Sequence, residues 1–172
     1  IINKTVFAVS RDDLKPALTG VLFKFGNDTI TAVATDGHRL VKYEKNNEKM
    51  GDFGDIIVPK KFLNLMAGGL NSGSIKLSVG ETHLTTTIGG DQYFTRIIDE
   101  NFPDFDGVIP KDNDKNLVVD KKALLSAVKR VSIFSNKSTH QVAFNISKEQ
   151  IFITTEDPES SSKAKEEIIA TY

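Results

Sequence analysis

The sequence contains no cysteine, so neither a disulfide framework nor a thiolate metal site can form. The same absence is typical of a reducing compartment, and we expect the protein to be cytoplasmic. Charges of opposite sign almost cancel, with 22 basic and 23 acidic residues and a formal net charge of -1. A chain this close to neutral has no overall attraction for nucleic acid, so any contact with DNA requires a local basic surface.

Long apolar runs and targeting signals are also missing. No run approaches the roughly 18 apolar residues of a membrane-spanning helix. The N-terminus, Ile1-Ile2-Asn3-Lys4, lacks a methionine and the basic, apolar and small-residue order of a signal peptide. We interpret it as a boundary inside a longer protein. The 172 residues, 39% of them hydrophobic, are enough for a sizeable core.

Several segments alternate between apolar and polar residues. Alternation covers residues 28–34, 75–79 and 142–146, and residues 150–154 are rich in β-branched side chains. A period of two gives a strand one buried and one wet face, as in an antiparallel sheet packed on one side. Gly26-Asn27 and Gly80-Glu81 lie between strand pairs, where a tight hairpin needs a residue tolerant of positive φ.

Helical periodicity marks three segments, which occupy residues 2–9, 62–66 and 124–131. Pro59 is well placed to open the second helix, and Gly68-Gly69 to end it. Asp120 is a good N-cap for the third helix, because its carboxylate can accept hydrogen bonds from the free N–H groups of the first turn.

These pieces repeat along the chain. The spacing of apolar residues and turn positions in residues 21–30 recurs in residues 75–84 and in residues 142–151, and a helical segment precedes each copy. The simpler alternative is that any two amphipathic hairpins look alike. We predict an α+β fold of repeated units, each a helix plus an antiparallel sheet, with the helices on one face of the sheets.

A segment with two prolines and many turn-forming residues, residues 99–115, separates the second copy from the third and marks a domain boundary. We predict a first domain over residues 1–112, with two copies and a truncated N-terminus. The second domain, residues 113–172, holds one incomplete copy. Since one helix-plus-sheet unit buries little surface by itself, we expect this domain to expose apolar edges and to associate.

One string of residues stands out: Ala34-Thr35-Asp36-Gly37-His38-Arg39-Leu40. Its Asp36-Gly37 pair is typical of a plain type I′ hairpin turn. An enzymatic interpretation has Asp36 orienting His38 as a base, although no partnered nucleophile motif accompanies them. A third interpretation is a binding patch of mixed polarity, formed by Thr35, His38, Arg39 and Leu40.

Metal and phosphate sites are not indicated. The three histidines lie far apart, without HExxH or paired spacing. The Gly-rich residues 68–73 follow a helix and precede a strand, the reverse of a phosphate-binding loop. The aspartates of residues 104–114 lack the spacing of a calcium loop. We expect no metal and no cofactor.

Basic residues fall partly on the helical segments, among them Lys60, Lys61 and Lys129. Gathered on one side they would face phosphates with salt-dependent, sequence-independent affinity; the alternative is an ordinary wet helix face. Ile133-Phe134, at the end of the third helix, is apolar where solvent is expected. This pair either packs into the core or lies at a subunit interface.

Taken in order, several motifs resemble the bacterial beta sliding clamp, the beta subunit of DNA polymerase III. The most specific is Ala34-Thr35-Asp36-Gly37-His38-Arg39-Leu40, and the others are Leu18-Thr19-Gly20-Val21-Leu22-Phe23, Ile57-Val58-Pro59-Lys60-Lys61, Phe102-Pro103-Asp104-Phe105, Val108-Ile109-Pro110, Ser132-Ile133-Phe134-Ser135-Asn136 and Ala170-Thr171-Tyr172. The resemblance covers essentially the whole chain. It spans the family's middle domain and the first half of its third domain.

The resemblance implies the DNA clamp fold, in which each domain holds two similar units and two three-domain subunits close into a ring lined by helices. It implies a non-catalytic processivity factor for DNA replication, a homodimer that encircles duplex DNA without reading its sequence. The implied partners are the replicative polymerase catalytic subunit, the clamp loader, and repair polymerases and other proteins with clamp-binding motifs. The alternative is a non-catalytic protein-binding module with a clamp-like fold and no DNA ring.

By motif position, the resemblance assigns residues to three surfaces. A peptide-binding pocket would include Leu18, Thr35, Gly37, His38, Arg39, Leu40, Pro103 and Val108. With helices lining the hole, we expect Arg11, Lys15, Lys60, Lys61 and Lys129 to face DNA. Ile133 and Phe134 match the subunit interface. The chain departs from the family at Pro16-Ala17, where aromatic residues are common, and the C-terminal residues that complete the pocket are not in this sequence.

Overall fold

The structure, a computed structural model, describes residues 1–26, 28–46, 54–69 and 75–172. It divides into two compact units, Ile1–Ile109 and Pro110–Tyr172. The boundary predicted after residue 112 falls in the same irregular segment, residues 99–115, which we call the connector. Asn27 of one predicted turn and residues 70–73 of the Gly-rich stretch lie outside the described residues.

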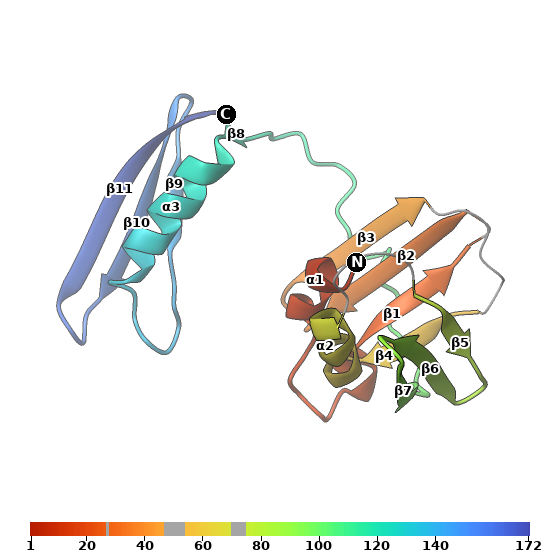
Figure 1. Cartoon of the computed structure of the whole chain (residues 1–172). Coiled ribbons are helices and arrows are strands. Elements are labelled where there is room, and N and C mark those ends of the chain that lie inside the picture. Colours follow the sequence, from red (N-terminus) through yellow and green to blue (C-terminus); the bar gives the residue numbers. More distant parts are fainter. Residues whose placement is uncertain (27, 47–53, 70–74) are drawn as a thin grey trace. The chain divides into compact units, whose positions relative to one another are not determined.

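Unit 1 contains two antiparallel sheets and a layer of short helices (Figure 1). The first sheet has the order β3-β2-β1-β4, from β1 (Gly20–Phe25), β2 (Thr29–Thr35), β3 (Leu40–Asn46) and β4 (Ile56–Pro59). The second has the order β5-β6-β7, from β5 (Leu77–Val79), β6 (His83–Ile88) and β7 (Asp91–Arg96). The helical segments are α1 (Ile2–Thr5), η1 (Val6–Ala8), η2 (Pro16–Thr19) and α2 (Lys60–Gly69).

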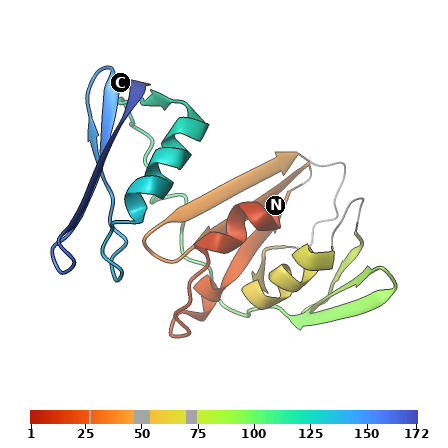
Figure 2. The ribbon, with the colours of Figure 1, turned by 60° about the vertical axis from the view of Figure 1, so that its left-hand side comes forward.

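Figures 1 and 2 show α1 and α2 side by side across one face of these sheets. Between helices and strands lies a core that joins Ala8 of η1, Leu63 of α2, Val21 of β1 and Leu84 of β6. The predicted helix layer on one face is therefore confirmed. Apolar residues at helical spacing on α2 and at alternate positions on the strands meet there, and their burial stabilises the unit.

The first sheet is also covered on its other face, which the alternating pattern did not predict. Leu22, Val33 and Ile57 point away from the helices and pack against Phe105, which belongs to the connector. As a result β2 carries an almost continuous run of buried residues, with Ala32, Val33 and Ala34 fully buried. A strand covered on both faces loses the wet face that alternation implies. We call this face of the first sheet the outer face.

The β5–β6 turn differs from the sequence prediction. In the β5–β6 turn the Gly80 N–H donates to the His83 carbonyl at 2.8 Å, yet neither Gly80 nor Glu81 has a positive φ. The positive φ values occur instead at Gly89 (+60°) and Gly90 (+93°), between β6 and β7. That pair forms the two-residue connection in which both central residues need positive φ, so glycine is the residue type that fits.

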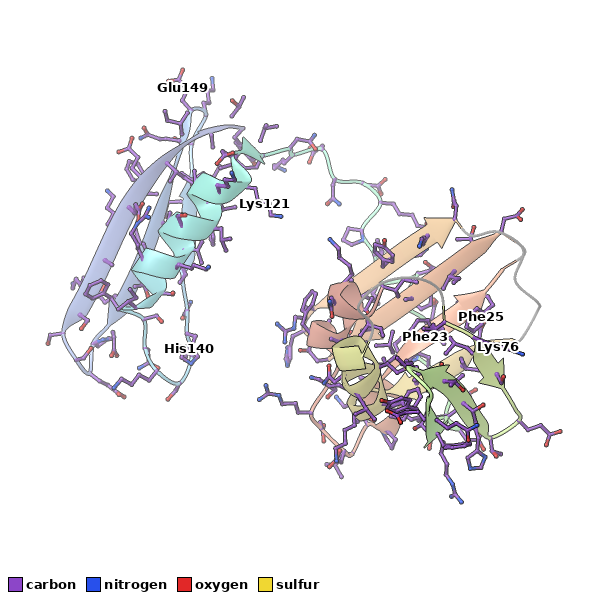
Figure 3. All side chains as sticks on the ribbon, viewed as in Figure 1. Phe23, Phe25, Lys76, Lys121, His140 and Glu149 are labelled. Atoms are coloured by element: carbon purple, nitrogen blue, oxygen red, sulfur yellow. The ribbon has the colours of Figure 1, made fainter. Side chains whose placement is uncertain are left out.

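Unit 2 repeats the pattern once. Its elements are β8 (Val118–Val119), α3 (Lys121–Ser132), β9 (Ala143–Ile146), β10 (Gln150–Asp157) and β11 (Ser162–Thr171), in the sheet order β8-β11-β10-β9. The predicted cap is confirmed, since the Asp120 carboxylate accepts from the Ala123 N–H at 2.7 Å. Figure 3 labels Lys121 at the start of this helix, His140 in the loop after it and Glu149 in the β9–β10 turn.

The sheet of unit 2 is covered over β10 and β11 but not over β9. Ile151 and Ile153 of β10 are fully buried beneath α3, whereas Phe144 and Ile146, their partners on β9, are 45% and 43% exposed. Directly opposed residues of antiparallel strands share a face, so this apolar surface continues the core without a helix above it. The expected apolar edge is present. Within the described residues, no helix has the length and apolar character needed to cross a membrane.

We predict that the exposed apolar face of β9 drives self-association. Replacing Phe144 and Ile146 together by Thr, which keeps strand propensity, is expected to lower the sedimentation coefficient measured at high protein concentration. Ile169→Thr is the matched control, because Ile169 is also exposed but lies on β11. Association that survives the double change and disappears with Ile169→Thr would contradict the prediction.

Candidate peptide-binding site

The β2–β3 connection, residues 36–39, is organised by its own side chains. The Asp36 Oδ1 atom accepts from the main-chain N–H groups of His38 (3.0 Å) and Arg39 (3.1 Å). Thr35 Oγ1 donates to the Arg39 carbonyl at 2.8 Å and accepts from the Gly37 N–H at 3.1 Å. The predicted type I′ turn is wrong: Thr35 pairs with Leu40 across four residues, and only Gly37 has a positive φ, of +89°. The Asp36 side chain accepts hydrogen bonds from the main-chain N–H groups that a two-residue turn would leave exposed.

Asp36 does not act on the His38 ring. Its Oδ2 atom accepts instead from Arg39 Nε at 3.0 Å, and none of the hydrogen bonds among described residues joins the carboxylate to the imidazole. The two main-chain N–H groups, of His38 and then of Arg39, are the main causes that hold the pKa of Asp36 below its ordinary value. The carboxylate is therefore an ionised structural anchor, and the orientation that a catalytic base needs is not seen.

Leu40 links this connection to the outer face. Its half-buried side chain packs against the cluster of Leu22, Val33, Ile57 and Phe105. Ala17, which precedes the predicted pocket residue Leu18, packs against the same cluster. Apolar side chains beside an ordered polar turn are suited to an apolar peptide anchor whose backbone needs orienting.

The other predicted pocket residues have different surroundings. Leu18 is buried in η2, and its carbonyl accepts from the Ser10 N–H at 2.9 Å. Pro103, on the connector, is exposed and borders a cleft of about 450 Å³ that is also lined by Leu22, Ile57 and Phe102. Val108 is 67% exposed. The structure thus unites Thr35, Gly37, His38, Arg39 and Leu40 in one connection and sets Pro103 and Val108 on another segment.

Phe7 is a residue of this region that sequence reasoning missed. It is half-exposed on η1, and the Arg39 guanidinium carbon lies 5.9 Å from its ring centroid. Arg39 is therefore held by the Asp36 carboxylate and by an aromatic face, a geometry that favours a cation. The sequence did contain a signal for its exposure, because Phe7 lies outside the apolar stripe formed by Ile2, Val6 and Val9.

Five basic residues were expected to face DNA. Arg11 and Lys15 are exposed between η1 and η2, and Lys60 and Lys61 begin α2; Lys129 is exposed on α3 of unit 2. None of the five is ion-paired with another residue in the described ranges, whereas Arg130 pairs with Glu166. Lys60 and Lys61 also stand at a helix N-terminus, where the macrodipole favours anions rather than cations.

Ile133 and Phe134, at the end of α3, are both exposed. Packing into the core, the simpler interpretation of this pair, is therefore wrong. Their exposed side chains are available for contact with another surface. Among the described residues, no three His, Asp or Glu side chains lie close enough to hold a metal ion.

Comparisons with known proteins match both units to the same protein family. The profile of the DNA polymerase III beta subunit central domain matches residues 1–104, and that of its C-terminal domain matches residues 106–172. The chain is 32% identical to the beta sliding clamp of Pseudomonas putida over 175 residues, covering 100% of this chain and 47% of the relative. It thus spans about half the length of the curated relatives it matches.

Solved structures are similar in fold. The DNA polymerase III subunit beta from Pseudomonas aeruginosa matches with a TM-score of 0.92 and 30% identity, over 99% of this chain and 48% of that one. A sliding clamp from the same species, bound to griselimycin, matches with a TM-score of 0.89 and 31% identity, over 100% of this chain and 47% of that one.

We predict that the β2–β3 connection loses order in acid. Because the pKa of Asp36 is lowered from 3.8 in the folded chain, its ionised form stabilises the connection above that pH. This contribution disappears as the pH falls through the folded pKa. The amide shifts of Gly37 and His38, followed by NMR on acidification, are expected to move with this titration. In Asp36→Asn they are expected to stay constant, and the β5–β6 turn amides serve as the internal reference. Identical titration of the two proteins would contradict the assignment.

Proposed function

The chain belongs to the DNA polymerase III beta subunit family, and on that premise we propose that it forms part of a DNA sliding clamp. In this role it is a non-catalytic processivity factor, which keeps the replicative polymerase on duplex DNA in the bacterial cytoplasm. The observation that carries the proposal is the match of both units to successive domains of this family. The alternative, a peptide-binding module that forms no ring, makes a different prediction below.

The DNA-facing surface is the helix layer. Arg11, Lys15, Lys60, Lys61 and Lys129 are the cations proposed to meet phosphates, and their lack of ion-pair partners within the described ranges supports this role. Contacts of this kind depend on salt and not on sequence. A protein that must slide benefits from weak phosphate contacts, because specific contacts with bases would hold it at one site.

The partner-facing surface is the peptide pocket. Leu18, Leu40, Pro103 and Val108 are proposed to receive an apolar anchor, and Thr35, Gly37, His38 and Arg39 to orient the peptide. The ordered connection and the apolar cluster beneath Leu40 support this division. The proposed ligands are clamp-binding motifs of the polymerase catalytic subunit, the clamp loader and repair polymerases. Griselimycin, bound by the relative from Pseudomonas aeruginosa, is proposed to compete with them.

Ile133 and Phe134 are proposed to lie at the subunit interface of a homodimeric ring. Two exposed apolar side chains beside each other at a helix end favour a protein contact over solvent. Ring closure then gives persistence on DNA by topology, so the contacts with phosphates need not be strong.

The pocket is tested in a chimera, the Pseudomonas putida relative with this chain in place of its matched half. A fluorescent peptide with a polymerase clamp-binding motif is expected to bind, and griselimycin to displace it. Val108→Asp is expected to weaken binding at least about tenfold, because a charge replaces an apolar wall. Val118→Asp is the matched control, since Val108 and Val118 are 67% and 69% exposed. Equal affinities of the two variants would remove Val108 from the pocket.

Ring function is tested with the same chimera and a clamp loader. The loaded protein is expected to stay on nicked circular DNA and to leave when the circle is cut. Lys60→Glu with Lys61→Glu is expected to reduce loading, more strongly at low salt, where phosphate contacts matter most. A peptide-binding module without a ring would bind the peptide and show no difference between circular and cut DNA.

A further inference from the structure

Phe105 occupies an unusual position for a residue outside any helix or strand. It lies on the connector, 7% exposed, and packs against Leu22, Val33 and Ile57 on the outer face. The ring of Phe102 approaches it edge-on, with 6.3 Å between the centroids. Phe105 therefore joins the connector to the first sheet through its aromatic side chain.

Two lysines from separate strands flank this ring. The Nζ atoms of Lys24 on β1 and Lys42 on β3 lie 5.8 and 5.7 Å from the Phe105 ring centroid. Strand β2 runs between β1 and β3, and its Val33 belongs to the same apolar cluster as the ring. Each cation is close enough for attraction to the aromatic face. The ring thus marks the boundary between the apolar and the charged half of the outer face.

The lysines are themselves fixed by carboxylates. Lys42 Nζ donates to Asp106 Oδ1 at 3.1 Å and lies 3.3 Å from Glu44, and Lys24 lies 3.3 Å from Asp55. The hydrogen bond to Asp106, followed by that to Glu44, raises the pKa of Lys42 above its ordinary value, because both carboxylates favour the cation. Because Asp106 follows Phe105 directly, Lys42 holds the connector at two adjacent residues.

Open space borders Phe105, although Phe102 and Ile109 of the connector also pack against the same apolar cluster. Phe105 lines both the cleft of about 450 Å³ and a second hollow of about 300 Å³ over β1 and β2. The Ile98 N–H donates to the Ile57 carbonyl at 2.9 Å, and Asp104 Oδ1 accepts from the N–H groups of Asp106 and Gly107. Of these three apolar connector side chains only Phe105 is buried, so its ring is the deepest apolar attachment in this stretch.

We propose that Phe105, held between Lys24 and Lys42, is a positioning residue that sets the connector as a wall of the peptide pocket. The inference rests on the proposed function, because Pro103 and Val108 are pocket residues only in that proposal. Pro103 lies two residues before Phe105 and Val108 three residues after it, so the position of the ring determines the positions of both. A loosened connector populates the binding-competent arrangement less, and the apparent affinity falls by that fraction.

The test compares Phe105→Leu, Lys42→Met and the double variant in the chimera. Leu keeps an apolar side chain but removes the ring, and Met keeps the stem of Lys42 but removes its charge. Each single change is expected to weaken peptide binding about fivefold. If the ring and the cation act together, the double variant is expected to lose less affinity than the product of the two single losses, and the Asp106 bond accounts for the part of the Lys42 loss that remains without the ring.

Phe23→Leu is the matched control. Phe23 stacks on Phe25 with 6.4 Å between ring centroids, and it packs against the helix-side core rather than the connector (Figure 3). It loses the same ring and is expected to leave the peptide affinity unchanged. Amide hydrogen exchange at Asp106 and Gly107, without ligand, is expected to accelerate in Phe105→Leu and Lys42→Met but not in Phe23→Leu.

The outcomes separate the two proposals. If the peptide binds and Val108→Asp weakens it, while Phe105→Leu matches Phe23→Leu in affinity and in exchange, the pocket stands and the positioning role is wrong. Losses that multiply in the double variant also overturn it. If no peptide binds, the proposed pocket is wrong, and exchange at Asp106 and Gly107 still decides whether Phe105 fixes the connector. Lys42→Met changes an outer-face side chain, so the test does not depend on tolerance of a core change.

Discussion

Burial of the first sheet on both faces is the constraint on which the rest of unit 1 depends. The helices cover one face through Leu63 and its neighbours, and the connector covers the other through Phe105. The packing is close where β1 begins, since a Cβ atom on Gly20 would lie 2.6 Å from the Val58 carbonyl oxygen and 2.9 Å from the Ile98 side chain. Since the connector is part of the core, the residues it carries are placed by packing as well as by chain connectivity. An irregular segment can form a recognition surface when its attachment is this deep.

Charge is distributed in line with this two-sided arrangement. Three cations of the first sheet and its β2–β3 connection are paired: Arg39 with Asp36 and, on the outer face, Lys24 with Asp55 and Lys42 with Asp106. Ion pairs this exposed add little stability, but they fix the direction of a side chain. The lysines that begin α2 have no such partner within the described part of the chain. A nearly neutral protein can in this way present oriented polar groups on one surface and available cations on another.

Local sequence patterns predicted the parts of the fold that depend on neighbouring residues. Periodicity located α2 and α3, Asp120 marked a cap, and the repeat indicated meanders that each follow a helix. Contacts between distant residues were not predictable in this way. Phe105 meets Lys24 and Lys42 only because the strand order brings β1 and β3 beneath the connector, and Arg39 meets Phe7 only through the helix layer. In the β2–β3 connection a turn was predictable from the Asp36-Gly37 pair, but its type was not, because the Asp36 carboxylate accepts from the main-chain N–H groups of His38 and Arg39.

The repeat also explains why the two units differ in what they leave exposed. A meander offers an apolar face wider than one helix, and in unit 1 the segments α1, η1 and α2 share that face, so its strands are covered. In unit 2 the single helix α3 covers β10 and β11, and the equivalent face of β9 stays open at Phe144 and Ile146. Pairing of repeats is thus a requirement of burial, because each copy supplies half of the helix layer that a complete face needs. The proposed peptide-binding surface borders the outer face, which the connector covers and no helix occupies.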